Sequence, residues 1–399
     1  MAGEKNKVIT DLKKMKKDSV KEKILQIFLE NRREALAGEV NSDGTLSGEM
    51  PVGEALSGEA LAARLGVSRT AVWKAVGALR SEGYPITGTP KLGYRLADEG
   101  ADTEAAPERF NAAEIISRLT EEARTAFSIH TVHETGSTNT DVREAGLSGE
   151  PEGYVLLAES QYAGRGRQGR SFYSPQNSGL YMSILLRPQL PAKDAVLLTA
   201  MAGVAAARAV ESLLGEDAAS AEVSGDSAAG QTPYPVMIKW VNDLIYRGHK
   251  ICGILTEGQI SLESGGLDQA VLGLGFNLTA PEGGWPEEIR DVAGGLFGGS
   301  VPRSVRVRLA AAFLNEFLPL YRSLSEKTFL PEYRARMLVL GQWVDVLEPD
   351  GSPRQAFAED LDDQCRLLLR FPGASSPTPL GSGEVRVKLP AGDRSRWLI

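Results

Sequence analysis

The sequence has few of the features that mark secreted, metal-binding or membrane-spanning proteins. Its 399 residues include only two cysteines, Cys252 and Cys365, which are too few for a disulfide framework and lack the spacing of a metal site. The first two dozen residues are lysine-rich and polar, without the apolar core of a signal peptide. The most apolar run, 195–210, contains Thr199 and Arg208 and is too short to span a bilayer. We therefore expect a soluble, cytoplasmic protein with no membrane partner.

The sequence also lacks an overall excess of positive charge. Its formal net charge is -8, so the chain as a whole is not built to bind a polyanion, and any contact with nucleic acid must be local. Histidine is scarce as well, and no role is assigned to the three residues present, His130, His133 and His249. What the chain does have is apolar material for a core, since 42% of its residues are hydrophobic.

The chain divides into three blocks that differ in composition, and together they predict an α+β protein of two or three domains. After a lysine-rich tail at 1–19, the first domain is expected at 20–97 and ends in a polar linker, 97–107. The second, at 108–338, mixes strands and helices, and the third, at 339–399, is short and β-rich. Strands are predicted at 154–158, 179–186, 235–240, 251–256, 271–278, 343–346, 365–371 and 384–388, and helices at 192–214 and 304–320. Two stretches poor in large apolar residues, 38–53 and 215–235, are expected to be mobile loops.

The first block contains the pattern of a helix-turn-helix. Ser57 is expected to cap a short helix that ends at a turn over Gly66 and Val67, and Ser68 to cap a second helix that Gly83 ends. The second helix places three apolar residues on one face, at the spacing i, i+4, i+7. These residues are Val72, Val76 and Leu79. Such a helix presents its polar N-terminal residues to the major groove of DNA.

A predicted two-stranded wing follows at 86–96, with a turn rich in glycine and proline. Between Ser57 and Leu96 there are six basic and two acidic residues, a local charge of +4 in a chain that is negative overall. Binding to DNA phosphates explains this reversal of sign, and the alternative is a helical hairpin used only for protein contacts. The residues expected to contact DNA are Ser68, Arg69, Thr70, Trp73, Lys74 and Lys91.

The central block contains a glycine-rich loop, AGRGRQGRSFYSP, in which Gly164, Gly166 and Gly169 have the spacing of a dinucleotide-binding loop. A Rossmann loop must open a helix. A helix is disfavoured here because two aromatic residues, then Pro175 and Gly179, follow the last glycine of the loop. A disordered arginine-glycine segment is also disfavoured, because the motif occurs once, between predicted strands. The favoured interpretation is a flexible loop whose arginine side chains bind an anionic ligand, each through two hydrogen bonds of its guanidinium.

Four further motifs in this block carry charged, amide or glycine residues at the ends of predicted strands or at turns. They are Gly136 to Thr140 (GSTNT), Lys239 to Asp243 (KWVND), Lys250 to Glu257 (KICGILTE) and Gly273 to Asn277 (GLGFN). Taken singly, each has a structural explanation, such as a surface lysine, a bulge or a helix cap. Alternate glycines on a strand also allow a ligand to lie against the backbone.

The set of motifs, in this order, resembles the biotin–protein ligases. The family carries a Ser-Thr-Asn turn, GRGRxGR, KWPND, KxxGILxE and GxGxN, and here Val241 replaces the usual proline and Gly136 stands where aspartate is common. The helix-turn-helix marks the bifunctional class, which also represses the biotin operon. The resemblance implies a winged helix-turn-helix, a catalytic domain with a mixed sheet like that of class II synthetases, and a small C-terminal SH3-like barrel.

The resemblance also implies an activity and a set of site residues. The reaction joins biotin to ATP, with Mg²⁺, as biotinyl-5′-AMP and then transfers biotin to a lysine of a biotin carboxyl carrier domain. The implied catalytic residues are Lys250, Arg165 and Arg167. The implied biotin site is Ser137, Thr138, Asn139, Gln161, Gly164, Arg165, Gly166, Arg167, Lys250, Gly253, Leu255, Gly273 and Gly275. The implied ATP site is Arg165, Arg167, Phe172, Lys239, Asn242, Asp243, Lys250 and Asn277, and no metal ligand is assigned.

Two alternatives to a bifunctional ligase and repressor stay open at this point. One is a DNA-binding biotin sensor whose ligase site does not turn over, although the retained Lys250, Arg165 and Arg167 argue against it. The other is a ligase whose helix-turn-helix does not bind DNA. Operator DNA and a second copy of the chain are the further expected partners, because helix-turn-helix proteins usually bind two half-sites.

Overall fold

The structure of the protein is a computed structural model. The residues described are 20–37, 55–81, 84–89, 93–96, 110–220, 235–260, 266–299, 301, 304–348, 351–389 and 396–398. The chain forms two compact units, Met1–Arg118 and Leu119–Ile399, which are described separately. The predicted linker 97–107, the loop 38–53 and Lys91 lie outside the described residues.

The first unit contains the predicted helix-turn-helix and wing. Helix α3 (Gly58–Leu65) begins after Ser57, whose hydroxyl accepts a hydrogen bond from the Ala60 amide. It ends at Gly66, which has a φ of 64° in the left-handed region that glycine adopts readily. Helix α4 (Arg69–Ser81) begins in the same way at Ser68, with a 3.2 Å bond from the Ala71 amide. Strands β1 (Ile86–Thr89) and β2 (Gly93–Leu96) form the antiparallel wing. Both predicted caps and both wing strands are confirmed.

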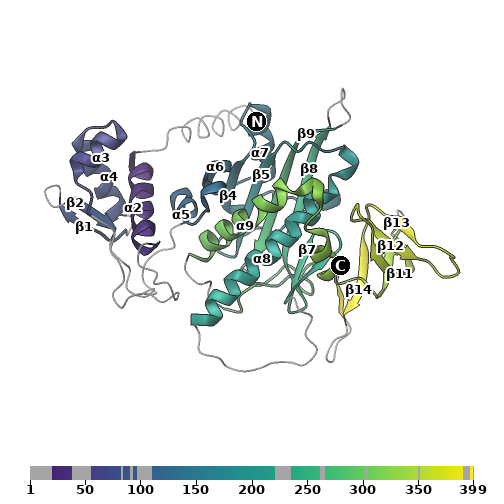
Figure 1. The fold of residues 1–399 in the computed structure, drawn as a ribbon. Coiled ribbons are helices and arrows are strands. Elements are labelled where there is room, and N and C mark those ends of the chain that lie inside the picture. Colours follow the sequence, from purple (N-terminus) through teal and green to yellow (C-terminus); the bar gives the residue numbers. More distant parts are fainter. Residues whose placement is uncertain are drawn as a thin grey trace, which may run out of the picture. The chain divides into compact units, whose positions relative to one another are not determined.

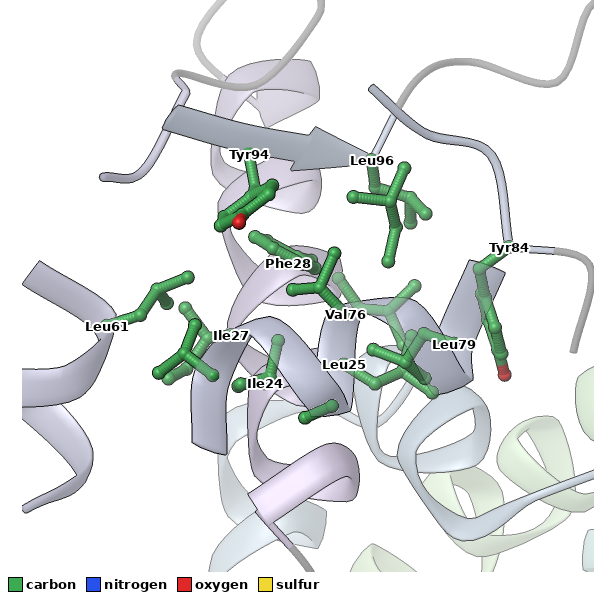
Figure 2. Close-up of a cluster of buried hydrophobic side chains, with 14 of the residues drawn as sticks. Ile24, Leu25, Ile27, Phe28, Leu61, Val76, Leu79, Tyr84, Tyr94 and Leu96 are labelled. Atoms are coloured by element: carbon green, nitrogen blue, oxygen red, sulfur yellow. The ribbon is translucent and has the colours of Figure 1, made fainter. Parts of the chain in front are cut away.

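A single apolar core holds these elements together, and Figure 2 shows it. Helix α2 (Val20–Ala37) contributes Phe28, and α4 contributes Val76 and Leu79, which are at most 2% exposed. Tyr94 and Leu96 of the wing close the cluster. Each such side chain contributes roughly 1.5–3 kcal/mol on burial, and this stabilisation fixes which face of α4 points outward. Helix α5 (Ala112–Ser117) completes the unit.

The second unit is built on a seven-stranded mixed sheet in the order β3-β4-β5-β9-β8-β7-β6. Figure 1 labels β4, β5, β9, β8 and β7 of this sheet. Only β3 and β4 are parallel; every other neighbouring pair is antiparallel. The strands are β3 (Ser128–Thr135), β4 (Tyr154–Gln161), β5 (Gly179–Leu186), β6 (Val236–Lys239), β7 (Asp243–Tyr246), β8 (His249–Ile260) and β9 (Leu267–Asn277). The prediction of a mixed sheet is confirmed, and β5 has the predicted bounds.

Helices cover both faces of this sheet. Helix α7 (Thr138–Leu147) packs on one face, where its Asn139 contacts Ser183 of β5 and lies over Gly273 of β9. Helix α8 (Val196–Ser220) packs on the opposite face, where Thr199 contacts Thr256 of β8. Helices α6 (Glu121–Ala126), α9 (Val305–Arg322) and α10 (Leu330–Ala335) complete the layers. The segment Ala192–Gly215 is long and apolar enough to span a bilayer by composition, but 78% of its most apolar window is buried inside the protein, as in a core helix.

Two expectations about local structure in this unit are wrong. A loop is predicted at 215–235, but residues 215–220 continue helix α8 instead. The part of this loop at 221–234 lies outside the described residues. The GSTNT motif is not the turn that was expected, but the alternative of a helix cap is confirmed, because Ser137 is the N-cap of α7 and Thr138 and Asn139 lie in its first turn. The helix begins here because the Thr138 amide donates to the side chain of Gln161 at 2.8 Å, which satisfies a donor that the helix itself leaves free.

The end of the chain forms a six-stranded antiparallel sheet within the second unit, in the order β13-β12-β11-β10-β14-β15. Its strands are β10 (Trp343–Leu347), β11 (Pro353–Leu361), β12 (Leu367–Arg370), β13 (Thr378–Leu380), β14 (Val385–Leu389) and β15 (Arg396–Leu398). The buried indole N–H of Trp240, just after β6, donates to the carbonyl of Cys365 at 3.0 Å. This bond ties the C-terminal sheet to the segment between β6 and β7.

Candidate ligand-binding site

The second unit contains a pocket of about 530 Å³ on the face of the main sheet that α7 covers. Its floor is formed by β8 and β9, and the glycine-rich loop, the ends of β6 and β7, and the segment 285–293 surround it. All of the predicted biotin- and ATP-site residues except Gly164 line this pocket. Residues from five sequence motifs, separated by up to 140 positions, therefore converge on one cavity.

Glycines on the two floor strands leave room for an aromatic ring. Gly253 and Gly275 are paired across β8 and β9, and the ring of Phe172 lies over both. A Cβ atom on Gly275 would lie 2.5 Å from Cε1 of Phe172, and one on Gly253 would lie 3.0 Å from its Cε2. These glycines are needed because the ring of Phe172 occupies the space that their side chains would fill.

A cluster of neutral polar side chains forms one end of the pocket. Oε1 of Gln161 accepts bonds from the amide and the hydroxyl of Thr138, at 2.8 and 3.1 Å, and Nε2 of Gln161 donates to the Ser174 hydroxyl. The hydroxyl of Ser183 lies 2.7 Å from Oγ1 of Thr138 and 2.6 Å from Oδ1 of Asn139. These bonds hold the hydroxyl and amide groups in fixed positions, as recognition of a neutral polar ligand requires.

A second part of the pocket is charged. Nζ of Lys250 lies 2.7 Å from Oδ1 of Asp243, and Asn277 Nδ2 donates to the backbone carbonyl of Lys250 at 3.2 Å. Lys239 is only 5% exposed, and burial lowers the pKa of its ammonium to about 8. The negative charge of Asp243 raises this pKa, but by less than burial lowers it. A buried cation of this kind binds an anion strongly, because little water competes for either partner.

The glycine-rich loop is a short hairpin closed by backbone bonds. The Phe172 amide donates to the Gly164 carbonyl at 2.9 Å, and the Gly166 amide to the Arg170 carbonyl at 2.7 Å. Arg167 donates to Oδ1 of Asn242 at 3.1 Å, and burial lowers the pKa of its guanidinium. Arg165 pairs with Glu257 of β8 at 2.9 Å. The loop therefore brings arginine side chains to the wall of the pocket.

No helix follows Gly169, so the prediction against a Rossmann loop is confirmed. The nearest helical element is a single 3-10 turn, Arg167–Gly169, which lies within the loop. After it the chain runs in extended and turn conformations to β5. The glycine-rich loop therefore contributes side-chain cations to this site and does not open a helix.

Several pocket residues were not predicted from the sequence. Arg170 of the loop pairs with Glu384, which precedes β14 in the C-terminal sheet, and Trp285 and Glu288 also line the pocket. No motif marks Glu384, Trp285 or Glu288, because they come from segments whose sequence shows only strand or loop character. Arg170 belongs to the same GRGRQGR motif as Arg165 and Arg167, so assigning all three arginines of the motif to the site would have included it.

The first unit carries the second candidate site, on the outer face of α4. Arg69, Thr70 and Lys74 are exposed, and Trp73 is 60% exposed although it is a large apolar side chain. Ser68, at the start of the same helix, is also exposed. The apolar residues of α4 face the core, so its remaining face is polar and basic, as a DNA-binding helix requires.

Comparison with known sequences gives two family matches. Residues 133–277 match the Biotin/lipoate A/B protein ligase family, and residues 53–95 match an HTH domain. These two segments contain, respectively, the motifs that line the pocket and the helix-turn-helix with its wing.

Two relatives by sequence agree with the ligase match. The "Bifunctional ligase/repressor BirA" of Bacillus subtilis is 32% identical over 279 residues, which cover 70% of this chain and 77% of that protein. The "Biotin--[acetyl-CoA-carboxylase] ligase" of Mycobacterium tuberculosis is 32% identical over 247 residues, or 61% of this chain and 83% of that protein. A structure of the biotin protein ligase of Aquifex aeolicus with biotin and ATP aligns with a TM-score of 0.49 at 25% identity, over 65% of this chain and 97% of that one.

Proposed function

This chain belongs to the family of bifunctional biotin ligases and repressors, and we propose from this premise how its residues carry out both activities. The ligase site is the pocket on the α7 face of the main sheet. The observation that supports it best is the division of this pocket into a neutral polar end and a cationic end. Biotin presents a neutral ureido group at one end and a carboxylate at the other, and ATP adds phosphates beside the carboxylate.

The reaction has two steps. An oxygen of the biotin carboxylate attacks the α-phosphorus of ATP, the bond to pyrophosphate breaks, and biotinyl-5′-AMP forms. The amine of a lysine on a biotin carboxyl carrier domain then attacks the acyl carbon, AMP leaves, and the amine loses a proton. Both reactants of the first step are anions, so cations that hold them together remove their repulsion and stabilise the charge that develops in the transition state.

We assign this work to four cations of the pocket. Lys250 contacts the biotin carboxylate and the α-phosphate, and the ion pair with Asp243 orients its ammonium. Arg165 and Arg167 bind phosphate from the glycine-rich loop, which closes over the adenylate and keeps water from a reactive mixed anhydride. Lys239 is a further phosphate contact. The Asn242 side chain supports Arg167 by accepting its hydrogen bond.

The remaining site residues recognise the neutral parts of the two substrates. Ser137, Thr138, Asn139 and Gln161 bind the ureido group of biotin. The floor and loop positions assigned to biotin are Gly164, Gly166, Gly253, Leu255, Gly273 and Gly275. Phe172 packs on adenine, and Asn277 hydrogen-bonds to its edge.

Mg²⁺ is proposed only as the ion that accompanies ATP. Among the residues that the structure describes, no group of three or more His, Cys, Asp or Glu side chains could hold a metal ion. The carboxylate of Asp243 is already engaged by Lys250, so the described residues do not form a magnesium site by themselves. No step is therefore assigned to the ion.

For the fold, we propose three domains with boundaries near 97–108 and 338–339. We propose that the catalytic sheet is of the class II synthetase type and that the C-terminal sheet is an SH3-like barrel. The six antiparallel strands of that sheet are compatible with such a barrel.

For the repressor, α4 enters the major groove, with Arg69, Thr70, Trp73 and Lys74 toward the bases and phosphates and Ser68 beside them. Lys91, which lies between β1 and β2 in the sequence, is also assigned to DNA binding. Two copies of the chain would bind the two half-sites of an operator, and a cytoplasmic location follows from both activities.

Two assays test these proposals separately. Biotin-dependent exchange of labelled pyrophosphate into ATP is expected, and its absence in protein that still binds biotin would identify a sensor without ligase turnover. A gel shift on the DNA upstream of the organism's own biotin genes is expected to strengthen with biotin and ATP. No shift under any condition would leave a ligase without a repressor function.

A further inference from the structure

Glu257 joins two parts of the pocket that lie far apart in the sequence. Its side chain, near the end of β8, is 24% exposed. Oε1 lies 2.9 Å from Nη2 of Arg165 in the glycine-rich loop, and Oε2 accepts a bond from Nδ2 of Asn139 in α7 at 2.8 Å. A carboxylate only accepts hydrogen bonds, so a single anion satisfies two donors, one charged and one neutral.

On the α7 side, this contact fixes which end of the Asn139 amide faces the sheet. Because Nδ2 must point to the acceptor Glu257, Oδ1 points to Ser183, whose hydroxyl lies 2.6 Å away. The same oxygen lies over Gly273, where a Cβ atom would be only 2.0 Å from it. Asn139 is 5% exposed, so no solvent replaces the carboxylate if it is removed.

On the loop side, the carboxylate holds an otherwise accessible arginine. The side chain of Arg165 is 41% exposed, and the hairpin around it is closed by backbone bonds that do not restrain a guanidinium. The ion pair with Glu257 keeps Arg165 against the pocket wall. An arginine held in place before the ligand arrives loses less freedom on binding.

We propose that Glu257 is a positioning residue of the ligase reaction, which orients Asn139 of α7 and Arg165 of the glycine-rich loop through one carboxylate. This inference rests on the proposed ligase function. It implies that the biotin site and the loop arginine are coupled, since neither donor can leave the carboxylate without changing the restraint on the other.

Glu257→Gln tests this role with little change in volume. A glutamine offers one acceptor oxygen and one donor amide, so it can satisfy Arg165 or Asn139 but not both. We expect pyrophosphate exchange with a higher KM for biotin and a lower kcat, each by about tenfold, the scale of one unsatisfied buried donor. Calorimetric titration with biotin alone is expected to show the same loss of affinity. Glu159→Gln is the matched control, because Glu159 on β4 pairs with the exposed His133 outside the pocket.

A compensating substitution separates positioning from a general loss of structure. Combining Glu257→Gln with Asn139→Asp reverses donor and acceptor between the two positions and keeps an oxygen facing Ser183. The KM for biotin of the double variant is expected to rise by less than the product of the two single effects, whereas independent effects would multiply. A double variant as impaired as the product of the singles overturns the proposal, as does a Glu257→Gln enzyme identical to wild type. A wild-type protein without any exchange would instead overturn the ligase function itself.

Discussion

The ammonium of Lys250 lies 2.7 Å from a carboxylate oxygen of Asp243, and both side chains line the cationic end of the pocket. The two residues come from neighbouring strands, β8 and β7, where Lys250 pairs with Ile245 and Asp243 with Gly253, so the lysine side chain reaches along the sheet to the carboxylate. The carboxylate holds the ammonium in one direction without removing it from the cavity.

The first prediction concerns Lys250. Lys250→Ala is expected to leave the fold intact and to reduce adenylation by at least about 10²-fold, the scale of losing one oriented charge stabiliser. The measurement is kcat/KM in biotin-dependent pyrophosphate exchange. Lys327→Ala is the control, because Lys327 pairs with Asp363 away from the pocket and its loss should not change the rate. Adenylation at the wild-type rate in Lys250→Ala would overturn the role assigned to this residue.

The second prediction concerns the pH dependence of stability at Lys239, whose pKa burial lowers from 10.5 to about 8. Below about pH 8 the lysine is protonated in both states, so the folded protein bears the full cost of the buried cation. Between the two pKa values only the folded state loses the proton. The free energy of unfolding of the wild type should therefore rise, relative to Lys239→Met, by on the order of 3 kcal/mol across this interval.

Denaturant unfolding of the two proteins at a series of pH values checks this. The wild type and the variant share all other titrating groups, so the difference between them isolates Lys239. Lys193→Met, at an exposed position outside the pocket, is the control for the loss of a lysine elsewhere in the chain. A constant difference for Lys239→Met would mean that the pKa of this lysine is not lowered in the folded state.

The third prediction concerns the glycine floor. A Cβ atom at Gly275 would lie 2.5 Å from the Phe172 ring, so Gly275→Ala must displace the ring proposed to stack on adenine. We expect the KM for ATP to rise by at least about tenfold, because small displacements at a binding site are costly. Gly298→Ala is the control, since a Cβ there would meet no atom within 4 Å. An unchanged KM for ATP in Gly275→Ala would remove Phe172 from the adenine site.

The fourth prediction concerns the exposed face of α4. Lys74→Ala is expected to weaken binding to DNA fragments of different sequence by similar factors and to reduce the slope of log K against log salt by about 1. Gel shifts across a series of salt concentrations measure this, with Lys193→Ala of the second unit as a control of equal charge. Retention of the wild-type slope in Lys74→Ala would show that Lys74 does not contact a phosphate.

The local structure of this protein follows closely from its sequence. The apolar spacing of 72, 76 and 79 and the caps Ser57 and Ser68 predict α3 and α4, and both helices are present. The motifs of the second unit likewise predict most of the residues that line the pocket. These predictions succeed because hydrogen bonding at helix ends and the burial of one face depend on residues close together in the chain.

Other local elements gave too weak a signal. Strands β3, β7 and β11 and helices α2 and α7 were not predicted, although each is present. Strand β3 is exposed at several positions, and β7 has only four residues, so neither shows a long apolar pattern. Helix α7 starts within a motif of hydroxyl and amide residues, which favour turns as readily as helix starts.

The sequence by itself determined the helix-turn-helix, the central strands and the chemical types of side chain at the pocket. Only the tertiary structure decided that Glu257 meets Asn139, 118 positions away, and that Arg170 meets Glu384, 214 positions away. Such contacts depend on the order of strands in the sheet and on the docking of the C-terminal sheet. The free energy of burying apolar surface, added over the whole chain, stabilises these arrangements. That total cannot be read from any short stretch of the sequence.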